Sequence, residues 1–219
     1  MTKRTERERI FVFGASGHAK VVIDILERQG LYEIAFLVDD DPSLKGTRFY
    51  GHDIVGGKQE LLNIKDQICG GIVAIGNNKA RISVAKWLTD NQIDLVSAIH
   101  PSVQLGRGVT VAAGTVIMAG AIINSDSRVG RNSIVNTKAS IDHDCTIGDG
   151  VHVAPGATLC GTVSIGDGTF VCAGVTIIPN LTIGRNALVG AGSTVIHDVY
   201  DRELVVGSPA RRIKALEEP

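Results

Sequence analysis

The sequence predicts a small α/β domain followed by a parallel β-helix. Three observations support this: strands alternate with helices over the first hundred residues, an aliphatic residue then recurs every six positions, and glycines recur every eighteen. The 219 residues suit one large domain or two small ones. We expect one domain over residues 1–100 and a second over 101–219, divided at the His100-Pro101 step, which disfavours helix.

The first domain shows strand patterns that alternate with helical patterns. Apolar runs predict strands at 10–13, at 35–41 before Pro42, and at 71–75 before a Gly-Asn-Asn turn. Amphipathic patterns predict helices at 20–28, ending at Gly30, and at 57–66 and 80–90. This alternation implies a Rossmann-like βαβαβ unit whose small parallel sheet is covered on both faces.

The second domain follows a period of six. Every sixth residue from Leu105 to Val195 is Leu, Ile or Val, and the residue two positions earlier is small or aliphatic, so both point inward from short strands. Glycine follows the aliphatic residue at four positions that lie eighteen residues apart: Gly130, Gly148, Gly166 and Gly184. Three hexads therefore form one triangular coil, and about five coils build the β-helix.

Composition and charge exclude several classes of partner. Lys plus Arg number 22 and Asp plus Glu 23, so no overall field favours nucleic acid or an anionic membrane. No apolar run approaches the ~20 residues of a spanning helix, and the charged first ten residues lack one, so we expect a cytoplasmic protein without a membrane span. The four cysteines form no CxxC pair, and we expect them to be reduced.

A glycine-rich turn between the first strand and the first helix predicts an anion site. Gly14, Ser16, Gly17 and His18 place backbone N–H groups at a helix N-terminus, where a phosphate binds well. The dinucleotide fingerprint GxGxxG is incomplete, because Ser16 replaces its second glycine. NAD is therefore disfavoured, and a nucleotide diphosphate remains open.

Two further loops end at the same edge of the predicted sheet. Asp39 and Asp40 follow the second strand, where they either accept hydrogen bonds from a ribose or base or form a solvated turn. Gly76 and Asn77 follow the third strand. The convergence of three loops favours a ligand at this edge.

Two histidines lie outside the β-helix core by register. His152 precedes an inward valine, and His143 lies at a corner between Asp142 and Asp144, either of which can orient its ring. The position one coil later is Gly161, which leaves room beside His143 and suggests an active site. The two histidines lie half a coil apart, so a zinc site of three histidines in one chain is disfavoured and we expect no metal. Cys145 occupies an inward slot and is expected in the core.

The hexapeptide series resembles the left-handed β-helix acyltransferases. Six segments of the chain are also similar to one narrower family, the bacterial N-acetyltransferases of nucleotide-linked 4-amino-4,6-dideoxy sugars, which are related to sialic acid O-acetyltransferases. These segments are, in order, GASGHAKVV, LVDDDP, VAIGNN, AIHPS, VNTKASIDHDCTIGDGVHVAPGA and VVGSPA. The resemblance implies a homotrimer with active sites between subunits. It also implies that acetyl-coenzyme A lies along the β-helix and that the N-terminal domain holds the nucleotide sugar.

The resemblance assigns roles to individual positions. His143 matches the general base of the family, and the acid that follows it is Asp144, where several relatives have Glu. Asn136 matches a residue near the sugar, and His152 matches a histidine near the acetyl group. Gly161 matches a position whose backbone contacts the thioester. The nucleotide-sugar positions are Gly14, Ser16, Gly17, His18, Asp39 and Asp40. The coenzyme A tail is Gly207, Pro209 and Ala210, and we expect the following Arg211 and Arg212 to hold its phosphates.

The implied reaction is a direct attack of the sugar amine on the acetyl thioester, with a UDP-linked sugar preferred and GDP- or dTDP-linked sugars possible. Two alternatives remain: an O-acetyltransferase of sialic acid or another glycan precursor, and a non-catalytic nucleotide-sensing trimeric scaffold. Outward apolar residues on the β-helix, Phe170 among them, also lead us to expect a trimer.

Overall fold

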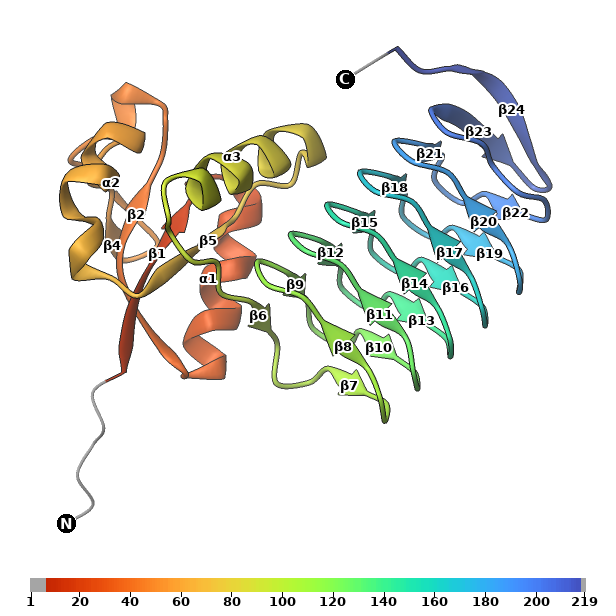
Figure 1. Cartoon of the computed structure of the whole chain (residues 1–219), viewed down its shortest axis with the longest axis horizontal. Helices are drawn as coiled ribbons and strands as arrows, with labels where there is room; N and C mark the ends of the chain where they lie inside the picture. The colour runs from red at the N-terminus through yellow and green to blue at the C-terminus, as the bar shows by residue number, and fades with distance from the viewer. Residues whose placement is uncertain (1–6, 218–219) are drawn as a thin grey trace.

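The computed structural model describes residues 7–217 and contains the two predicted parts (Figure 1). The N-terminal part has a three-stranded parallel sheet in the order β2-β1-β5. The bounds are β1 Glu8–Phe13, α1 Gly17–Gln29, β2 Tyr32–Val38, η1 Pro42–Leu44, β3 Arg48–Phe49, β4 His52–Asp53, α2 Lys58–Ile64, η2 Lys65–Gln67, β5 Gly70–Val73 and α3 Asn78–Asp90.

The sheet is covered on both faces, as predicted. Helix α1 packs with Ile10, Val12 and Ile72 on one face, whereas α2 and α3 pack with Phe11 and Phe13 on the other. This alternation follows from β1 itself, because successive side chains of a strand point to opposite faces and the run is apolar throughout.

Two local features differ from the predictions. Helix α1 begins at Gly17, three residues early, because Ser16 already has the extended backbone of an N-cap; it ends as predicted at Gly30, which has a left-handed φ of 67°. The antiparallel pair β3–β4 was not predicted, since its two-residue strands, unlike those of the β-helix, belong to no repeat along the chain.

The second part is a β-helix with three faces, named here by the sheets that form them. The eight-stranded face comprises β6 Ala98–Ile99, β9 Val116–Ile117, β12 Ile134–Val135, β15 His152–Val153, β18 Phe170–Val171, β21 Leu188–Val189, β23 Glu203–Gly207 and β24 Ala210–Ala215. The six-stranded face comprises β7 Gln104–Leu105, β10 Ile122–Ile123, β13 Ser140–Ile141, β16 Thr158–Leu159, β19 Thr176–Ile177 and β22 Thr194–Val195. The five-stranded face comprises β8 Thr110–Val111, β11 Arg128–Val129, β14 Thr146–Ile147, β17 Ser164–Ile165 and β20 Thr182–Ile183.

Strands on one face pair in parallel at a spacing of eighteen residues, as between Ile123 and Ile141. The predicted aliphatic series forms a continuous core between the faces. Leu105, the first member of the series, is an exception with 45% of its surface exposed, because it lies in the first coil and no coil lies beneath it.

Four buried hydroxyl side chains connect successive coils. Ser133 Oγ donates to the carbonyl of Gly148 at 2.9 Å and accepts from the Val151 N–H at 3.1 Å. Thr115 and Thr169 make the same pair of bonds at this corner one and two coils away, and Ser127 does so at the preceding corner. These hydroxyls satisfy backbone groups at corners of the β-helix that are buried away from water.

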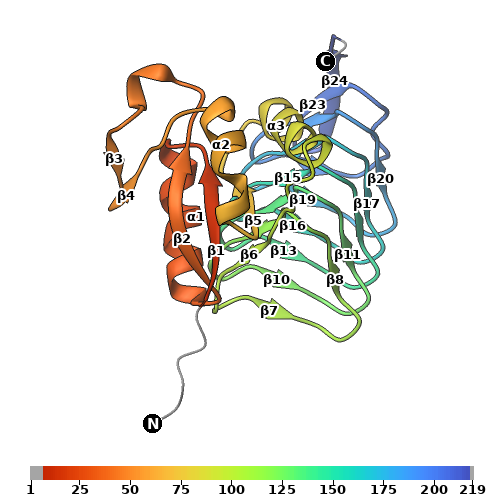
Figure 2. The same ribbon diagram turned by 60° about the vertical axis from the view of Figure 1, so that its left-hand side comes forward.

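The two parts share a hydrophobic junction. Helix α1 lies between the three-stranded sheet and the eight-stranded face, where it covers Val116 and Ile134 completely (Figure 2). The chain's own N-terminal part thus covers the outward side chains of Val116 and Ile134. For these two residues, the prediction that outward apolar side chains are exposed and favour a trimer was wrong. Strand β6 already pairs with β9, so the eight-stranded face begins just ahead of the predicted boundary at His100-Pro101.

Within residues 7–217, no helix has the length and apolar composition needed to cross a bilayer.

We predict that Ser133→Ala lowers the stability of the fold by about 1–3 kcal/mol, because it leaves a buried carbonyl and a buried N–H without their partner. The urea midpoint, followed by circular dichroism, measures the change. Ser164→Ala on the exposed side of β17 is the matched control and should shift stability by less than about 0.5 kcal/mol. Equal midpoints for the two variants would contradict a connecting role for the buried hydroxyl.

Candidate active site

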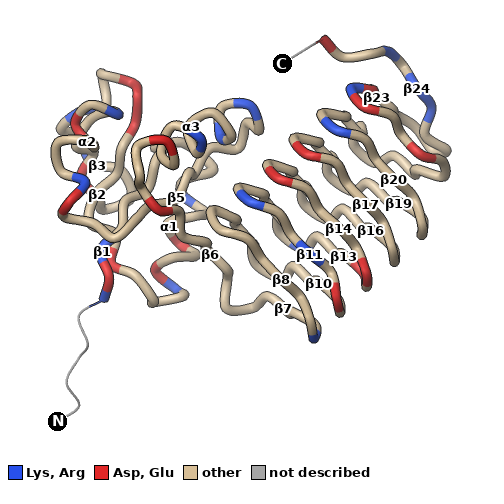
Figure 3. Tube along the Cα trace, in the orientation of Figure 1, with Lys and Arg blue, Asp and Glu red and all other residues tan. Residues whose placement is uncertain are grey.

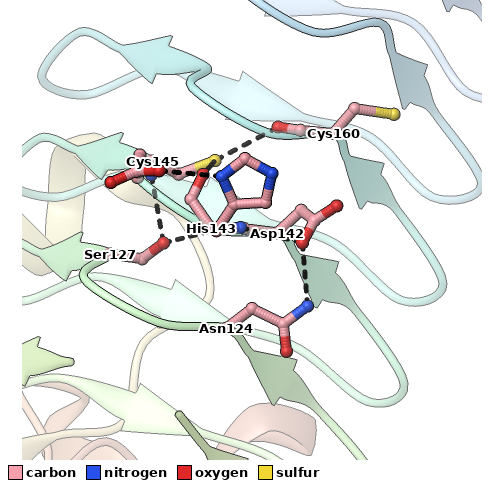
Figure 4. A network of polar contacts seen from close by, with 7 residues as sticks. Asn124, Ser127, Asp142, His143, Cys145 and Cys160 are labelled. Carbon is pink, nitrogen blue, oxygen red and sulfur yellow. Dashed lines mark hydrogen bonds and ion pairs between the residues drawn. The ribbon is translucent and has the colours of Figure 1, made fainter. Parts of the chain in front are cut away.

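His143 lies in the turn between β13 and β14, where 57% of its side chain is exposed (Figure 4). Its Nδ1 is 2.8 Å from Asp144 Oδ2. The carboxylate only accepts, so Nδ1 carries the proton and Nε2 of the neutral ring keeps a free lone pair. The hydrogen bond to Asp144 raises the pKa of His143, and the charge of Asp142 adds to the effect.

Asp144, rather than Asp142, is the carboxylate that orients the ring. Asp144 has a left-handed φ of 59°, and its side chain reaches back to the preceding histidine. Asp142 Oδ1 instead accepts from Asn124 Nδ2 at 2.9 Å and from the His143 backbone N–H at 2.9 Å, which fixes the corner (Figure 4).

Gly161 lies one coil later, against the ring of His143. A Cβ built on Gly161 would be 2.6 Å from both Cε1 and Nε2 of that ring, so any larger residue would displace the imidazole. Cys145 is fully buried, and its Sγ lies 3.2 Å from the Cys160 carbonyl. Burial raises the pKa of this thiol, so its predicted place in the core is confirmed.

The glycine-rich loop precedes the first turn of α1. The side chain of Ser16 makes no capping bond to the helix, and a Cβ on Gly17 would meet nothing within 4 Å. The first N–H groups of a helix have no partner within it, so this N-terminus can receive an anion.

Both aspartates after β2 are engaged within the protein. Asp39 accepts from the Ala15 N–H at 2.8 Å and from the Asp41 N–H at 2.9 Å, so it ties the loop after β2 to the glycine-rich loop. Asp40 forms an ion pair with Lys58 at 2.9 Å. A turn whose carboxylates contact only solvent was one of the two expectations for Asp39 and Asp40. The structure instead gives both carboxylates bonds within the protein, and thus a structural role.

The loop after β5 adjoins the glycine-rich loop. Asn77 caps α3 by accepting from the Ala80 N–H at 2.9 Å. A Cβ on Gly76 would lie 3.8 Å from His18 Cβ, so the predicted meeting of these loops at one edge of the sheet occurs.

His152 points out of the β-helix core, as its register predicts, but the N-terminal part covers it and leaves only 7% exposed. Its ring stacks on Phe170 with centroids 4.7 Å apart, and Nε2 is 3.0 Å from Asn136 Nδ2. The Asn136 Oδ1 accepts from the Thr137 N–H, so Nδ2 must donate and Nε2 of His152 must accept. His152 is therefore a neutral ring with its proton on Nδ1.

The buried histidines differ in charge from the exposed one. Burial lowers the pKa of both His18 and His152 to about 4, and the nearby charge of Arg81 adds to each shift. Nε2 of His18 is buried without a hydrogen-bond partner, and the backbone of Gly76 only partly offsets the lowering of the pKa of His152. Both rings therefore stay neutral at the pH where His143 exchanges its proton.

The predicted residues fall into two groups on different sides of the chain. His18, Gly76, Asn136 and His152 gather at the eight-stranded face, under the N-terminal part. His143 lies at the corner between the six- and five-stranded faces, opposite to it. A single chain therefore does not bring the two groups together.

The C-terminal hairpin β23–β24 carries the predicted coenzyme A tail, and Figure 3 shows basic residues along β24. Gly207 adopts a φ of 103°, and the Ser208-Pro209 peptide that follows is cis, ahead of Ala210. Arg212 is paired with Glu203 at 2.8 Å, whereas Arg211 donates only to the carbonyl of Ala210 among its described bonds.

Across the described residues, no group of three or more His, Cys, Asp or Glu side chains is arranged to hold a metal ion. Sequence reasoning missed Arg81, whose side chain is fully buried between the two parts. Its only signal was a basic residue on the inner side of a predicted amphipathic helix.

Comparison with protein-family models matches residues 9–88 to the PglD N-terminal domain, and residues 126–161 and 162–197 to the bacterial transferase hexapeptide (six repeats). One similar crystal structure is a histidine-to-asparagine variant of perosamine N-acetyltransferase from Caulobacter crescentus in complex with CoA and GDP-perosamine. It is 38% identical, covers 94% of this chain and 96% of that one, and has a TM-score of 0.89. This chain belongs to the nucleotide-sugar N-acetyltransferases of the hexapeptide-repeat family.

Two other relatives agree with this family. The acetyltransferase domain of PglB from Neisseria gonorrhoeae, in complex with acetyl coenzyme A, is 31% identical over 94% of this chain and 100% of that one, with a TM-score of 0.86. UDP-N-acetylbacillosamine N-acetyltransferase of Bacillus subtilis is 35% identical over 113 residues, which span 51% of this chain and 52% of that protein. The predicted left-handed β-helix fold and acetyl-coenzyme A as the co-substrate are confirmed at the level of the family.

We predict that Asp144→Asn lowers the pKa of His143 toward the ordinary value of about 6.5, because the amide removes the charged acceptor at Nδ1. Asp142→Asn should lower it less, since Asp142 acts only through space. Titration of the imidazole resonances by NMR measures both shifts.

Asp126→Asn is the matched control, since Asp126 occupies the same left-handed corner position one coil earlier, with a φ of 61°. The pKa of His143 should stay unchanged in that variant. A larger shift in Asp142→Asn than in Asp144→Asn would contradict the assignment of Asp144 as the orienting residue.

Proposed function

We propose that this protein transfers the acetyl group of acetyl-coenzyme A to the 4-amino group of a nucleotide-linked 4-amino-4,6-dideoxy sugar. In this proposal residues 1–100 hold the nucleotide sugar and residues 101–219 carry out acetyl transfer. The observation that carries it is the exposed imidazole of His143, bonded at Nδ1 to Asp144 and bordered by Gly161, in a chain whose relatives are N-acetyltransferases.

In the proposed mechanism, the amine nitrogen attacks the thioester carbonyl and forms the new C–N bond. His143 Nε2 accepts the proton that the amine loses, because Asp144 fixes the other ring nitrogen as a donor. The C–S bond then breaks, and coenzyme A takes the proton from His143 and leaves as the thiol. The Gly161 N–H is placed one coil from the base, where it can stabilise the oxyanion.

The nucleobase of the sugar is a separate part of the proposal. A UDP-linked sugar is our sequence prediction, and the Bacillus subtilis relative bears a UDP-sugar name. The Caulobacter crescentus relative, which matches nearly the whole chain, was crystallised with GDP-perosamine. Assays with UDP-, GDP- and dTDP-linked 4-amino sugars, in which free thiol is measured, therefore test the base together with the reaction.

We also propose that the protein works as a homotrimer with each active site shared between two copies. The separation of His143 from the nucleotide loops and from the His18–His152 group supports this, because a neighbouring copy must supply the missing side of the site. In this proposal the C-terminal hairpin, in which Arg211 is exposed, holds the phosphates of coenzyme A at the same shared site.

We predict that His143→Ala lowers kcat by about 10²- to 10⁴-fold, because the general base is lost while ground-state contacts remain. The melting temperature should move little, since the side chain is exposed and leaves no cavity. His52→Ala is the control and should keep the parent rate, because it removes an imidazole of β4 that is bonded to Glu27 of α1 in the N-terminal part. A kcat within threefold of the parent at pH 7.5 in His143→Ala would rule out general-base catalysis by this residue.

We predict that Gly17→Asp abolishes turnover at ordinary substrate levels, because it puts a negative charge at the helix N-terminus that is proposed to bind the diphosphate. Coexpression of Gly17→Asp with His143→Ala should restore part of the activity, since mixed trimers contain sites built from one intact copy of each half. Thiol release by purified mixed trimers measures this recovery.

Gly17→Asn is the neutral control and should raise the KM for the sugar only slightly, because the space around Gly17 accepts a side chain of this size. If mixed assemblies stay as inactive as the two single variants, the site lies within one chain and the shared-site proposal fails.

A further inference from the structure

Arg81, in the first turns of α3, is the largest of the fully buried side chains. Its guanidinium makes five hydrogen bonds, and every acceptor is a neutral oxygen. Nε donates to the Asn132 carbonyl at 2.7 Å, and Nη2 donates to the Gly150 carbonyl and to Asn78 Oδ1, both at 2.9 Å. Nη1 donates to the carbonyls of Ile75 and Gly76 at 3.2 and 3.1 Å.

These acceptors come from three parts of the chain: the loop after β5, the start of α3 at Asn78, and the β-helix. Ile75 and Gly76 belong to the loop after β5, which the proposed function assigns to the nucleotide sugar. Asn132 and Gly150 lie at the same corner of two successive coils, eighteen residues apart. One side chain thus fastens the loop to two rungs of the β-helix.

The chemistry of this contact requires arginine. Burial lowers the pKa of Arg81 to about 10, so the side chain remains charged at neutral pH. A planar guanidinium offers five N–H donors in a fixed arrangement, whereas the lysine ammonium offers three on a flexible stem. Hydrogen bonds from a charged donor are also stronger than those between neutral groups.

We infer that Arg81 is a positioning residue for acetyl transfer: it holds the Gly76–Asn77 loop at a fixed place against the Asn136–His152 pair of the β-helix. This inference rests on the proposed function, because it gives the loop a substrate to hold. Arg81 is not catalytic itself, since its whole side chain is buried and its donors are all used.

A neighbouring residue separates positioning from simple packing. Ile82, next along α3, packs its Cδ1 against Gly150 at the same junction but makes no bond to the loop after β5. Arg81 thus joins the loop to the β-helix, and Asn78 Nδ2 adds bonds to the Gly168 and Thr169 carbonyls, whereas Ile82 contributes only an apolar contact of α3. Ile82 is 38% exposed, so a change there should lower stability less than a change at Arg81, and only the change at Arg81 should weaken substrate binding.

The test compares Arg81→Lys, Arg81→Met and Ile82→Ala in the full-length protein. We expect Arg81→Lys to raise the KM for the nucleotide sugar about tenfold while the KM for acetyl-coenzyme A stays within twofold. We expect Ile82→Ala to lower the melting temperature with both KM values within twofold of the parent. If Arg81→Met folds, it should raise the KM for the nucleotide sugar more than Arg81→Lys does. If it does not fold, Arg81→Lys alone tests the inference.

Hydrogen–deuterium exchange of a peptide over residues 72–80 gives a readout that needs no substrate. Faster exchange there in Arg81→Lys, and parent-like exchange in Ile82→Ala, supports the inference. Equal rises in both KM values, or unchanged exchange of this peptide in Arg81→Lys, overturns it. A parent protein that acetylates no nucleotide sugar defeats the proposed function instead, while the exchange result still shows whether Arg81 holds the loop.

Discussion

Every coil of the β-helix must satisfy its backbone hydrogen bonds through the coils on either side, and the rest of the structure depends on this constraint. Strand pairs at a spacing of eighteen residues meet it on the faces, and buried hydroxyls such as that of Ser133 meet it at the corners. Residues one coil apart are therefore fixed as neighbours. The contact of His143 with Gly161 is a consequence of this spacing, and no additional element is needed to hold it.

The same fold places histidines in opposite environments. His143 stands at an exposed corner with a carboxylate on Nδ1, and its pKa is raised. His18 and His152 lie under the N-terminal part beside Arg81, and their pKa values are lowered. Residues of one type thereby differ in their readiness to bind a proton, with one exposed ring of raised pKa and two buried rings that stay neutral.

The six-residue period was sufficient to predict the core, the outward register of His143 and its pairing with Gly161, because all three follow from local repetition. The burial of His152 and Arg81 was not predictable in this way, since it arises from the contact between two parts distant in sequence. The choice of Asp144 over Asp142 depends on a left-handed backbone at Asp144, which the sequence does not reveal. The β3–β4 pair was missed because its two-residue strands occur once and belong to no repeat.

The two ends of the β-helix differ. At the C-terminal end the hairpin β23–β24 extends the eight-stranded face beyond β21, and Val195, the last residue of the aliphatic series, is 1% exposed. At the opposite end, Leu105 in the edge strand β7 is 45% exposed. Because β24 runs antiparallel to β23, the parallel ladder of the eight-stranded face ends there, and the first coil of a second copy could not continue that ladder as one more parallel coil.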